Sequence, residues 1–272
     1  MIFIVNNFHY FIIGCCIGSF LNVIVYRFPN NYSIIKPRSF CPKCKTRLTW
    51  KENIPLISWV FQKGQCINCN SFINIRYPLI ELITGILFVV FRNSSPTLFI
   101  LNDNYFFNIL YSWLFLSLLI CISLIDIDRY WIPQGLINFG IFSGILGLIF
   151  IAIANDEFID IFFIVKGILT FASSFLVFES LRKLAKFIFK KEAIGKGDSK
   201  LVAMISLWLG PIGTLLTVGL AYIFAAFYCL LGLSTGFLKI REVIPFAPFL
   251  SLGGLFMWFL GNEFIFEKIL LI

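Results

Sequence analysis

Residues 105–125 read YFFNILYSWLFLSLLICISLI, a stretch of 21 consecutive residues without a charged side chain. A helix needs about 20 mostly apolar residues to cross the hydrocarbon core of a bilayer. The sequence therefore predicts an all-α membrane protein that crosses the bilayer several times. Similar apolar runs lie near residues 7–27, 78–93, 134–154, 159–179, 212–235 and 243–262.

The composition supports the same fold class. Of the 272 residues, 59% are hydrophobic and 13% are charged, and the mean hydropathy is +0.92. A soluble domain carries about 45–50% apolar and about 25% charged residues, which excludes an ordinary soluble enzyme. The 34 phenylalanines fit helices that face lipid.

The net charge of +8 is explained by topology. Of the 22 lysines and arginines, 19 fall at Arg129 or within residues 27–76, 182–200 and 239–241. The connections 94–104 and 155–160 carry four acids and no basic residue. Cytosolic loops of membrane proteins are enriched in Lys and Arg, so the basic side is expected to face the cytosol. Nucleic acid is therefore not an expected partner.

The apolar run Leu201–Leu209 is too short to cross a bilayer as a straight helix, and it ends at Gly210-Pro211. A Gly-Pro break allows such a run to turn back or to join its neighbour. The basic segments on either side of residues 200–239 require an even number of crossings between them. We therefore expect about eight transmembrane helices, with both termini outside the cytosol. The first apolar run lacks a basic start and a small-residue cleavage site, so we expect it to be retained.

Residues 28–77 form the one long polar segment and contain Cys41-Pro-Lys-Cys44 and Cys66-Ile-Asn-Cys69. Two Cys-x-x-Cys pairs at this spacing are typical of a structural zinc site, because each turn brings two thiolates to one ion. The cytosol keeps thiols reduced, which favours metal ligation over disulfides. Incidental cysteines and a redox dithiol are the alternatives, and the strand-helix pattern of a redox domain is missing.

Two aspartates stand at the ends of apolar runs on the basic side: Asp126 in Leu124-Ile-Asp126-Ile-Asp128-Arg129, and Asp198 in Gly195-Lys-Gly197-Asp198. Two adjacent carboxylates share one proton, so that one acts as a base and the other as an acid. That pair can activate water against an amide and protonate the leaving nitrogen. Gly195 and Gly197 would let a substrate backbone approach closely.

Both aspartates also have structural explanations. Asp198 or its neighbour Ser199 could cap a helix N-terminus. Asp126 could be an interface residue paired with Arg129. Their common side and their position at span ends favour a function.

The chain resembles the type IV prepilin leader peptidases, which are aspartic membrane proteases of the Gly-x-Gly-Asp type. The resemblance implies that Asp126, seven residues before Pro133, and Asp198 are catalytic. Gln134 and Ala247 depart from the family pattern and are not expected to touch a proton-transfer group. The matching segments are Gly18-Ser-Phe-Leu-Asn22-Val-Ile-Val-Tyr-Arg27-Phe-Pro29, Cys41-Pro-Lys-Cys44, Asn53-Ile-Pro-Leu-Ile-Ser-Trp59, Lys63-Gly-Gln-Cys66-Ile-Asn-Cys69, Arg76-Tyr-Pro-Leu-Ile-Glu81 and Gly195-Lys-Gly-Asp-Ser-Lys-Leu201.

The resemblance further implies a division of labour: a first transmembrane helix (1–27), a zinc-binding cytosolic loop associated with methylation (28–77) and a peptidase bundle (78–272). The substrates would be prepilins or pseudopilins of type IV pili, type II secretion or competence systems. Cleavage would occur at the cytosolic face of the bacterial inner membrane, followed by methylation of the new N-terminal amine with S-adenosylmethionine.

Three further polar residues carry open interpretations. Asn22 and Arg27 would either position substrate or cap the first span. Glu81 would bind the substrate amine or the sulfonium of the methyl donor, or it would favour a helix N-terminus. The rival functions are a proton-coupled transporter, for which no internal repeat is visible, and a scaffold, which leaves the aspartates unexplained.

Overall fold

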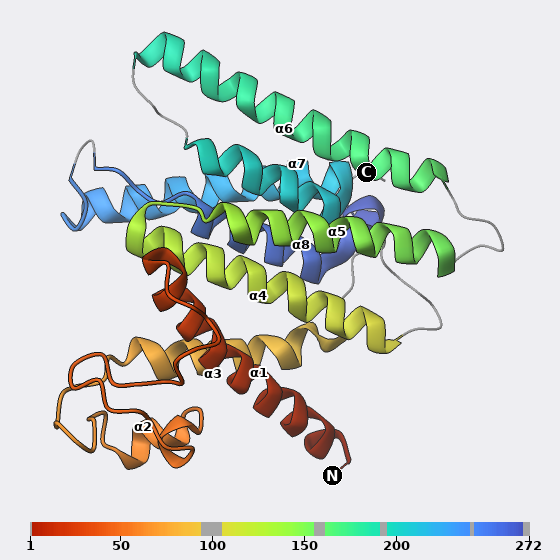
Figure 1. Cartoon of the computed structure of the whole chain (residues 1–272). Helices are drawn as coiled ribbons and strands as arrows, with labels where there is room; N and C mark the ends of the chain where they lie inside the picture. The colour runs from red at the N-terminus through yellow and green to blue at the C-terminus, as the bar shows by residue number, and fades with distance from the viewer. Residues whose placement is uncertain (1, 94–104, 155–160, 191–194, 240–241, 269–272) are drawn as a thin grey trace. The chain divides into compact units, whose positions relative to one another are not determined.

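The computed structural model describes residues 2–93, 105–154, 161–190, 195–239 and 242–268 (Figure 1). Within these ranges all regular structure is helical, with two isolated β-bridges, which confirms the all-α prediction. The acidic connections 94–104 and 155–160 lie outside the described residues. The described residues contain eight α-helices: α1 (Ile2–Arg27), α2 (Ile57–Phe61), α3 (Arg76–Val90), α4 (Tyr105–Arg129), α5 (Gln134–Ala154), α6 (Ile161–Phe189), α7 (Lys196–Ser234) and α8 (Ala247–Lys268).

Five of these helices are long and apolar enough to cross a membrane, and a shorter apolar helix covers Ala247–Gly261. The protein is therefore a multi-pass membrane protein. Helix α6 runs ten residues beyond the expected end at residue 179, because its last turns carry basic residues that suit an interface. The five candidate spans are Asn7–Asn30, Phe106–Arg129, Gln134–Ile153, Ile161–Ile188 and Lys196–Ser234.

The chain forms two compact units, Met1–Arg92 and Asn93–Ile272. The first contains α1, α2, α3 and the loop between α1 and α3. The second contains α4 to α8. The division into a first helix, a loop and a peptidase bundle concerns function and stays a prediction.

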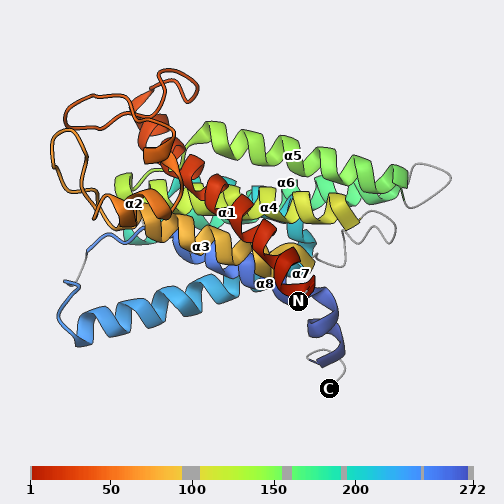
Figure 2. The ribbon, with the colours of Figure 1, turned by 90° about the horizontal axis from the view of Figure 1, so that it is seen from below.

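In the first unit, α1 and α3 lie side by side (Figure 2), and glycines lie where the two backbones come close together. A Cβ atom on Gly14 would lie 2.8 Å from the Cα atom of Gly85, and one on Gly18 would lie 2.9 Å from the Cα atom of Glu81. Small residues at such crossings let two helix backbones approach within a membrane. The close packing fixes α1 and α3 against each other.

The second unit has an aromatic core shared by four helices. The Trp208 ring of α7 stacks on Tyr111 of α4, with ring centroids 4.2 Å apart, and its indole N–H donates to the Gly140 carbonyl of α5 at 2.9 Å. Trp258 of α8 lies 4.7 Å from the Phe115 ring and donates to Ser112. Buried indole N–H groups need such partners. The core ties α4, α5, α7 and α8 together.

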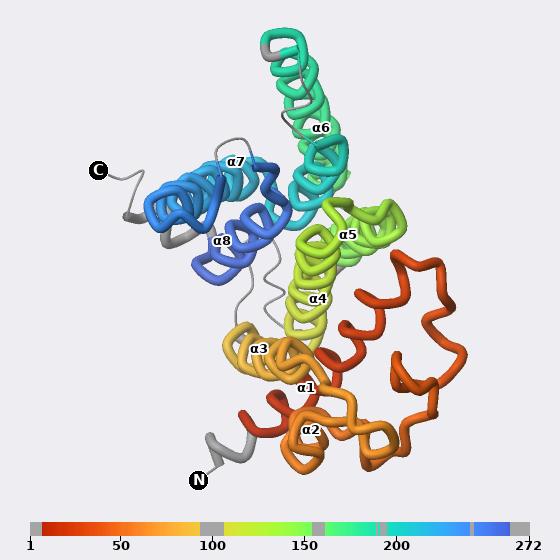
Figure 3. Tube along the Cα trace, turned by 90° about the vertical axis from the view of Figure 1, so that its left-hand side faces the viewer, coloured from red at the N-terminus to blue at the C-terminus, as the bar shows by residue number. Residues whose placement is uncertain are grey.

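Helix α7 reverses direction at Gly210, whose φ of 69° and ψ of −175° are not helical. Figures 1 and 3 show its two halves as neighbouring antiparallel rods. The charge of Asp198, 12 residues before Gly210, acts on Tyr222, 12 residues after it. A straight helix would hold these residues about 36 Å apart. The short run Leu201–Leu209 is thus a separate pass that turns back at Gly210-Pro211.

Candidate active site and metal centre

Asp126 lies one turn before the end of α4 and is 6% exposed. The helix ends because Tyr130 takes a left-handed conformation (φ 51°), and its N–H donates to the Asp126 carbonyl at 2.8 Å. Asp128, two residues on, points to the opposite side and is exposed. Helical spacing therefore separates the two carboxylates, and Asp126 is the one that faces the bundle interior.

The carboxylate of Asp126 meets the start of α8. Its Oδ2 atom accepts a hydrogen bond of 3.1 Å from the backbone N–H of Ala247, the first residue of α8. The first N–H groups of a helix have no partner inside it and favour an anion. The expectation that Ala247 touches no proton-transfer group is therefore wrong. The contact is made by backbone, which the sequence pattern does not reveal.

Asp198 lies in the first turn of α7 and is 7% exposed. Its Oδ2 atom accepts a 3.1 Å hydrogen bond from the N–H of Gly195, the N-cap residue. The capping interpretation of Asp198 is thus confirmed. It does not exclude chemistry, because the negative charge of Asp126 also acts on this carboxyl. Two buried carboxylates from different helices therefore form one electrostatic pair.

Gly197 allows the loop between α4 and α5 to approach the start of α7. A Cβ atom on Gly197 would lie 2.8 Å from the Cβ atom of Ile132, closer than real Cβ atoms come to a neighbour. A Cβ atom on Gly195 would lie 2.9 Å from Asp198 Oδ2. Both glycines therefore have close neighbours within the protein. The expectation that they make room for a substrate backbone stays a prediction.

Tyr222, in the second half of α7, lies close enough to Asp198 to feel its charge. The charge of Asp198 acts on its phenol, and its ring lies 5.2 Å from that of Phe246, just before α8. Nothing in the local sequence singles out this tyrosine. The reversal at Gly210 could have revealed it, because residues equidistant from a helical turn come together.

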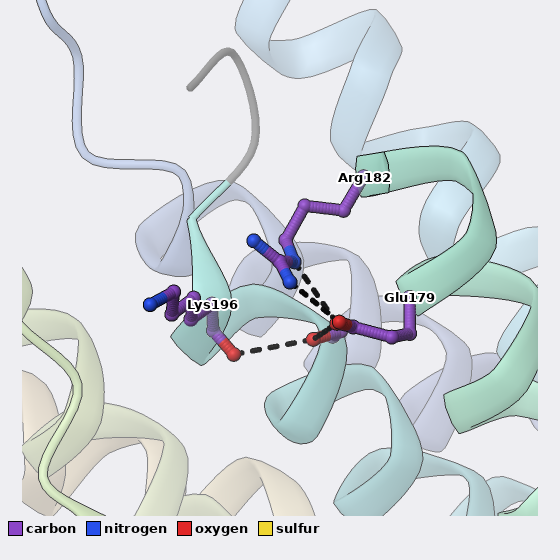
Figure 4. Close-up of polar contacts among 4 residues, drawn as sticks. Glu179, Arg182 and Lys196 are labelled. Atoms are coloured by element: carbon purple, nitrogen blue, oxygen red, sulfur yellow. Dashed lines mark hydrogen bonds and ion pairs between the residues drawn. The ribbon is translucent and has the colours of Figure 1, made fainter. Parts of the chain in front are cut away.

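A polar cluster supports the start of α7 from outside. Arg182 pairs with Glu179 through two hydrogen bonds of 2.9 and 2.5 Å, and the Ser199 hydroxyl lies 3.5 Å from Glu179 Oε2 and donates to the Lys196 carbonyl at 3.1 Å. Figure 4 shows Glu179 and Arg182 on α6 turned toward the first turn of α7. Ser199 follows Asp198 and is 1% exposed. The cluster thus links α6 to the residue beside the buried aspartate.

The four loop cysteines form a candidate metal centre in the first unit. All four sulfur atoms lie within 4.8 Å of one another. Cys41 and Cys69 are 3.9 Å apart, and Cys44 and Cys66 are 4.0 Å apart. A zinc–sulfur bond of about 2.3 Å gives about 3.8 Å between two sulfurs of a tetrahedron. The cluster fits one zinc ion and is too open for disulfides.

The two Cys-x-x-Cys turns have the same backbone design. In each, the residue after the second cysteine, Lys45 or Asn70, has a positive φ and donates its N–H to the carbonyl of the first cysteine at 2.9 Å. Burial opposes ionisation of Cys41, but hydrogen bonds from the N–H groups of Cys44 and Lys43 and with the Cys44 and Cys66 thiols together outweigh it and lower the pKa of Cys41 to about 6. Thiolates are the form that binds metal.

Asn22, Arg27 and Glu81 lie around one cavity of about 390 Å³ in the first unit. Asn22 donates to the Tyr77 carbonyl at 3.1 Å, which ties α1 to α3. The Arg27 guanidinium donates to the carbonyls of Ser33, Ile34 and Arg38. Arg27 is thus a clamp on the loop. Glu81 accepts the Leu56 N–H at 2.8 Å.

Residues 12–94 match the bacterial peptidase A24 N-terminal domain, and residues 113–230 match the type IV leader peptidase family. The chain belongs to the type IV leader peptidase family. Its relatives include a type 4 prepilin-like proteins leader peptide-processing enzyme of Escherichia coli, 32% identical over 89% of both chains. A prepilin leader peptidase/N-methyltransferase of Bacillus subtilis is 32% identical over 94% of both chains.

A leader peptidase/N-methyltransferase of Myxococcus xanthus is 36% identical over 76% of this chain, and this match spans 58% of that relative. No solved structure matches the chain. In this leader peptidase family member, each family domain lies mostly within one structural unit: the A24 N-terminal match covers the cysteine cluster, and the leader peptidase match covers both buried aspartates.

Proposed function

We propose that this protein is a membrane aspartic endopeptidase that removes the basic leader from type IV prepilins and pseudopilins. We propose further that it methylates the new N-terminal amine with S-adenosylmethionine. Family membership supports the activity class. The observation that carries the peptidase assignment is the electrostatic pair of buried carboxylates, Asp126 and Asp198, held at two helix N-termini.

The pair would work by shared proton transfer. One carboxylate takes a proton from a water molecule as that water attacks the scissile carbonyl, and the other gives its proton to the leaving nitrogen. The N–H groups of Ala247 and Gly195 each fix one oxygen of their carboxylate. The remaining oxygens would exchange protons with water and substrate.

The substrate assignment rests on topology. In the sequence, most basic residues fall in the segments next to Asp126 and Asp198, and by the positive-inside bias this side would face the cytosol at a bacterial inner membrane. A prepilin keeps its apolar helix in lipid and its basic leader in water. A carboxylate pair at that surface would reach the peptide bond that joins the basic leader to the apolar helix.

Methylation would belong to the first unit. Two of the relatives named above are called N-methyltransferases, and this unit contains the cavity with Glu81. Zinc held by Cys41, Cys44, Cys66 and Cys69 would act structurally, since four protein ligands leave no open position. A loop with so little apolar core is stabilised by such an ion.

The test is cleavage of a synthetic prepilin N-terminal segment by the purified full chain in lipid nanodiscs. We expect truncation at the leader boundary, and loss of it in Asp126→Asn and Asp198→Asn. Full activity in both variants would refute the aspartic mechanism. A transporter would instead move protons into liposomes without cleaving the peptide, and a scaffold would do neither.

A further inference from the structure

The cavity of the first unit has the size and lining of a small-molecule site. Its volume of about 390 Å³ falls in the usual range of about 300–1,000 Å³ for such sites. It is lined by the end of α1, the cysteine-bearing loop and the start of α3. Its walls include the rings of Phe40, Trp59 and Tyr77 and the side-chain amides of Asn53 and Gln62. Such walls suit a planar heteroaromatic ring that stacks and forms hydrogen bonds.

Glu81 gives this cavity a negative charge. The residue is 9% exposed, and no lysine or arginine among the described residues forms an ion pair with it. Its carboxylate accepts hydrogen bonds from the Leu56 N–H and the Ser19 hydroxyl, which are both neutral donors. A buried carboxylate without a counter-charge is costly in a protein. A cation in the cavity would remove that cost.

The backbone that contacts Glu81 is strained at Leu56. Leu56 has a φ of 60° and a ψ of −52°, and the Ile57 N–H donates to the Pro55 carbonyl at 2.6 Å. These values describe a tight γ-turn that non-glycine residues rarely adopt. Strained residues persist where their surroundings fix them, often at ligand sites. Here Glu81 fixes Leu56 and the loop wall together.

Arg27 does not neutralise Glu81. Its guanidinium is used by three loop carbonyls, and it lies 5.6 Å from the centroid of the Phe40 ring. The guanidinium of Arg27 therefore binds the loop carbonyls and leaves the negative charge of Glu81 without a counter-charge from this residue. Aromatic rings such as Phe40 also attract cations.

We propose that this cavity binds the sulfonium methyl donor, with Glu81 facing the positive sulfur. This assignment rests on the proposed methyltransferase activity and gives the place where its methyl donor binds. The amine lone pair of the cleaved substrate attacks the methyl carbon, and the carbon–sulfur bond breaks with its electron pair moving to sulfur. The thioether product is neutral, and the amine releases one proton to water. Glu81 therefore favours the donor over the spent product.

The test compares S-adenosylmethionine with S-adenosylhomocysteine, its neutral thioether, by calorimetric titration of the full chain in nanodiscs. Glu81→Gln keeps an acceptor for Leu56 and removes the charge. We expect it to weaken S-adenosylmethionine binding about tenfold or more and to leave thioether binding nearly unchanged. Glu242→Gln, on an exposed residue of the second unit, is the matched charge control and should bind like wild type.

Unchanged donor binding in Glu81→Gln would overturn the assignment. If the Glu81→Gln protein loses its metal, Gln62→Glu is the second test. A second carboxylate on the cavity wall should raise the preference for S-adenosylmethionine over S-adenosylhomocysteine. An unchanged preference rejects the site. If wild-type protein neither binds the donor nor methylates cleaved substrate, the proposed methylation itself fails. If the variants still methylate the cleaved substrate and bind the donor over the thioether as wild type does, this site assignment is refuted and the proposed methylation stands.

Discussion

The backbone N–H of Ala247 donates a 3.1 Å hydrogen bond to Oδ2 of Asp126, across 121 residues of sequence. Helix α8 therefore begins at a carboxylate that lies in the last turn of α4. The same arrangement recurs at Asp198, which accepts the N–H of Gly195 at the start of α7. Each carboxylate is thus oriented by a helix N-terminus, and the sequence pattern indicates this only for Asp198.

The first prediction separates two neighbouring aspartates. Asp126→Asn should lower kcat for leader cleavage by about 10²–10⁴-fold, because it removes one partner of the proton-sharing pair. Asp128→Asn changes the same side chain on the exposed side of α4 and should stay within about threefold of wild type. Single-turnover cleavage of a prepilin peptide measures both. Equal losses in the two variants would contradict the assignment.

The second prediction concerns the approach of Ile132 to the start of α7. Gly197→Ala would place a Cβ atom 2.8 Å from Ile132, and this overpacking should cost about 1–3 kcal/mol and displace Asp198. We expect a lower kcat and a lower thermal midpoint. Gly219→Ala in the same helix meets nothing within 4 Å and serves as the control. Wild-type kinetics in Gly197→Ala would show that the loop adjusts freely.

The third prediction assigns the polar cluster a positioning role. Ser199→Ala removes a buried hydroxyl shared by the Lys196 carbonyl and Glu179, and should reduce kcat about three- to tenfold with KM unchanged. Ser199→Thr, which keeps the hydroxyl, should recover most of the rate. Ser180→Ala removes an exposed hydroxyl that only contacts its own helix and should have no effect. A rise in KM alone would argue for substrate contact instead.

The fourth prediction tests the metal centre. Cys41→Ser should lower the zinc content of purified protein from one ion per chain to well below one, measured by atomic emission. Because Cys41 and Cys66 also line the cavity, binding of S-adenosylmethionine should fall with the zinc. Cys229→Ser on α7 is the control and should retain full metal. A Cys41→Ser protein with full zinc would place the ion elsewhere.

The sequence predicts the helices well, because an apolar run of membrane length has few alternatives. It also predicts the reversal at Gly210, since charge placement on both sides demands an extra pass. Helix ends are less predictable: α6 continues to Phe189 past the apolar run, because a helix that leaves lipid needs no apolar residues.

The site is predictable in part. The resemblance to the leader peptidases, through the spacing to Pro133, selects Asp126 over Asp128, and the structure separates the two residues by burial. The contributions of Ala247 and Ile132 are not predictable, because one acts through its backbone N–H and the other through a close approach that depends on tertiary packing. The roles of Glu179 and Ser199 also require two helices to be placed together.

All nine residues from Leu201 to Leu209 are buried, so this pass of α7 has no face turned to lipid or solvent. Most helices tolerate substitutions with a period of about 3.6 residues, because one side is free. A saturation mutagenesis map of this pass should lack this 3.6-residue period, and substitutions by charged residues should reduce function at every position. The aspartate at its start is therefore carried by a fully buried pass, and variants that change specificity are expected to accumulate elsewhere.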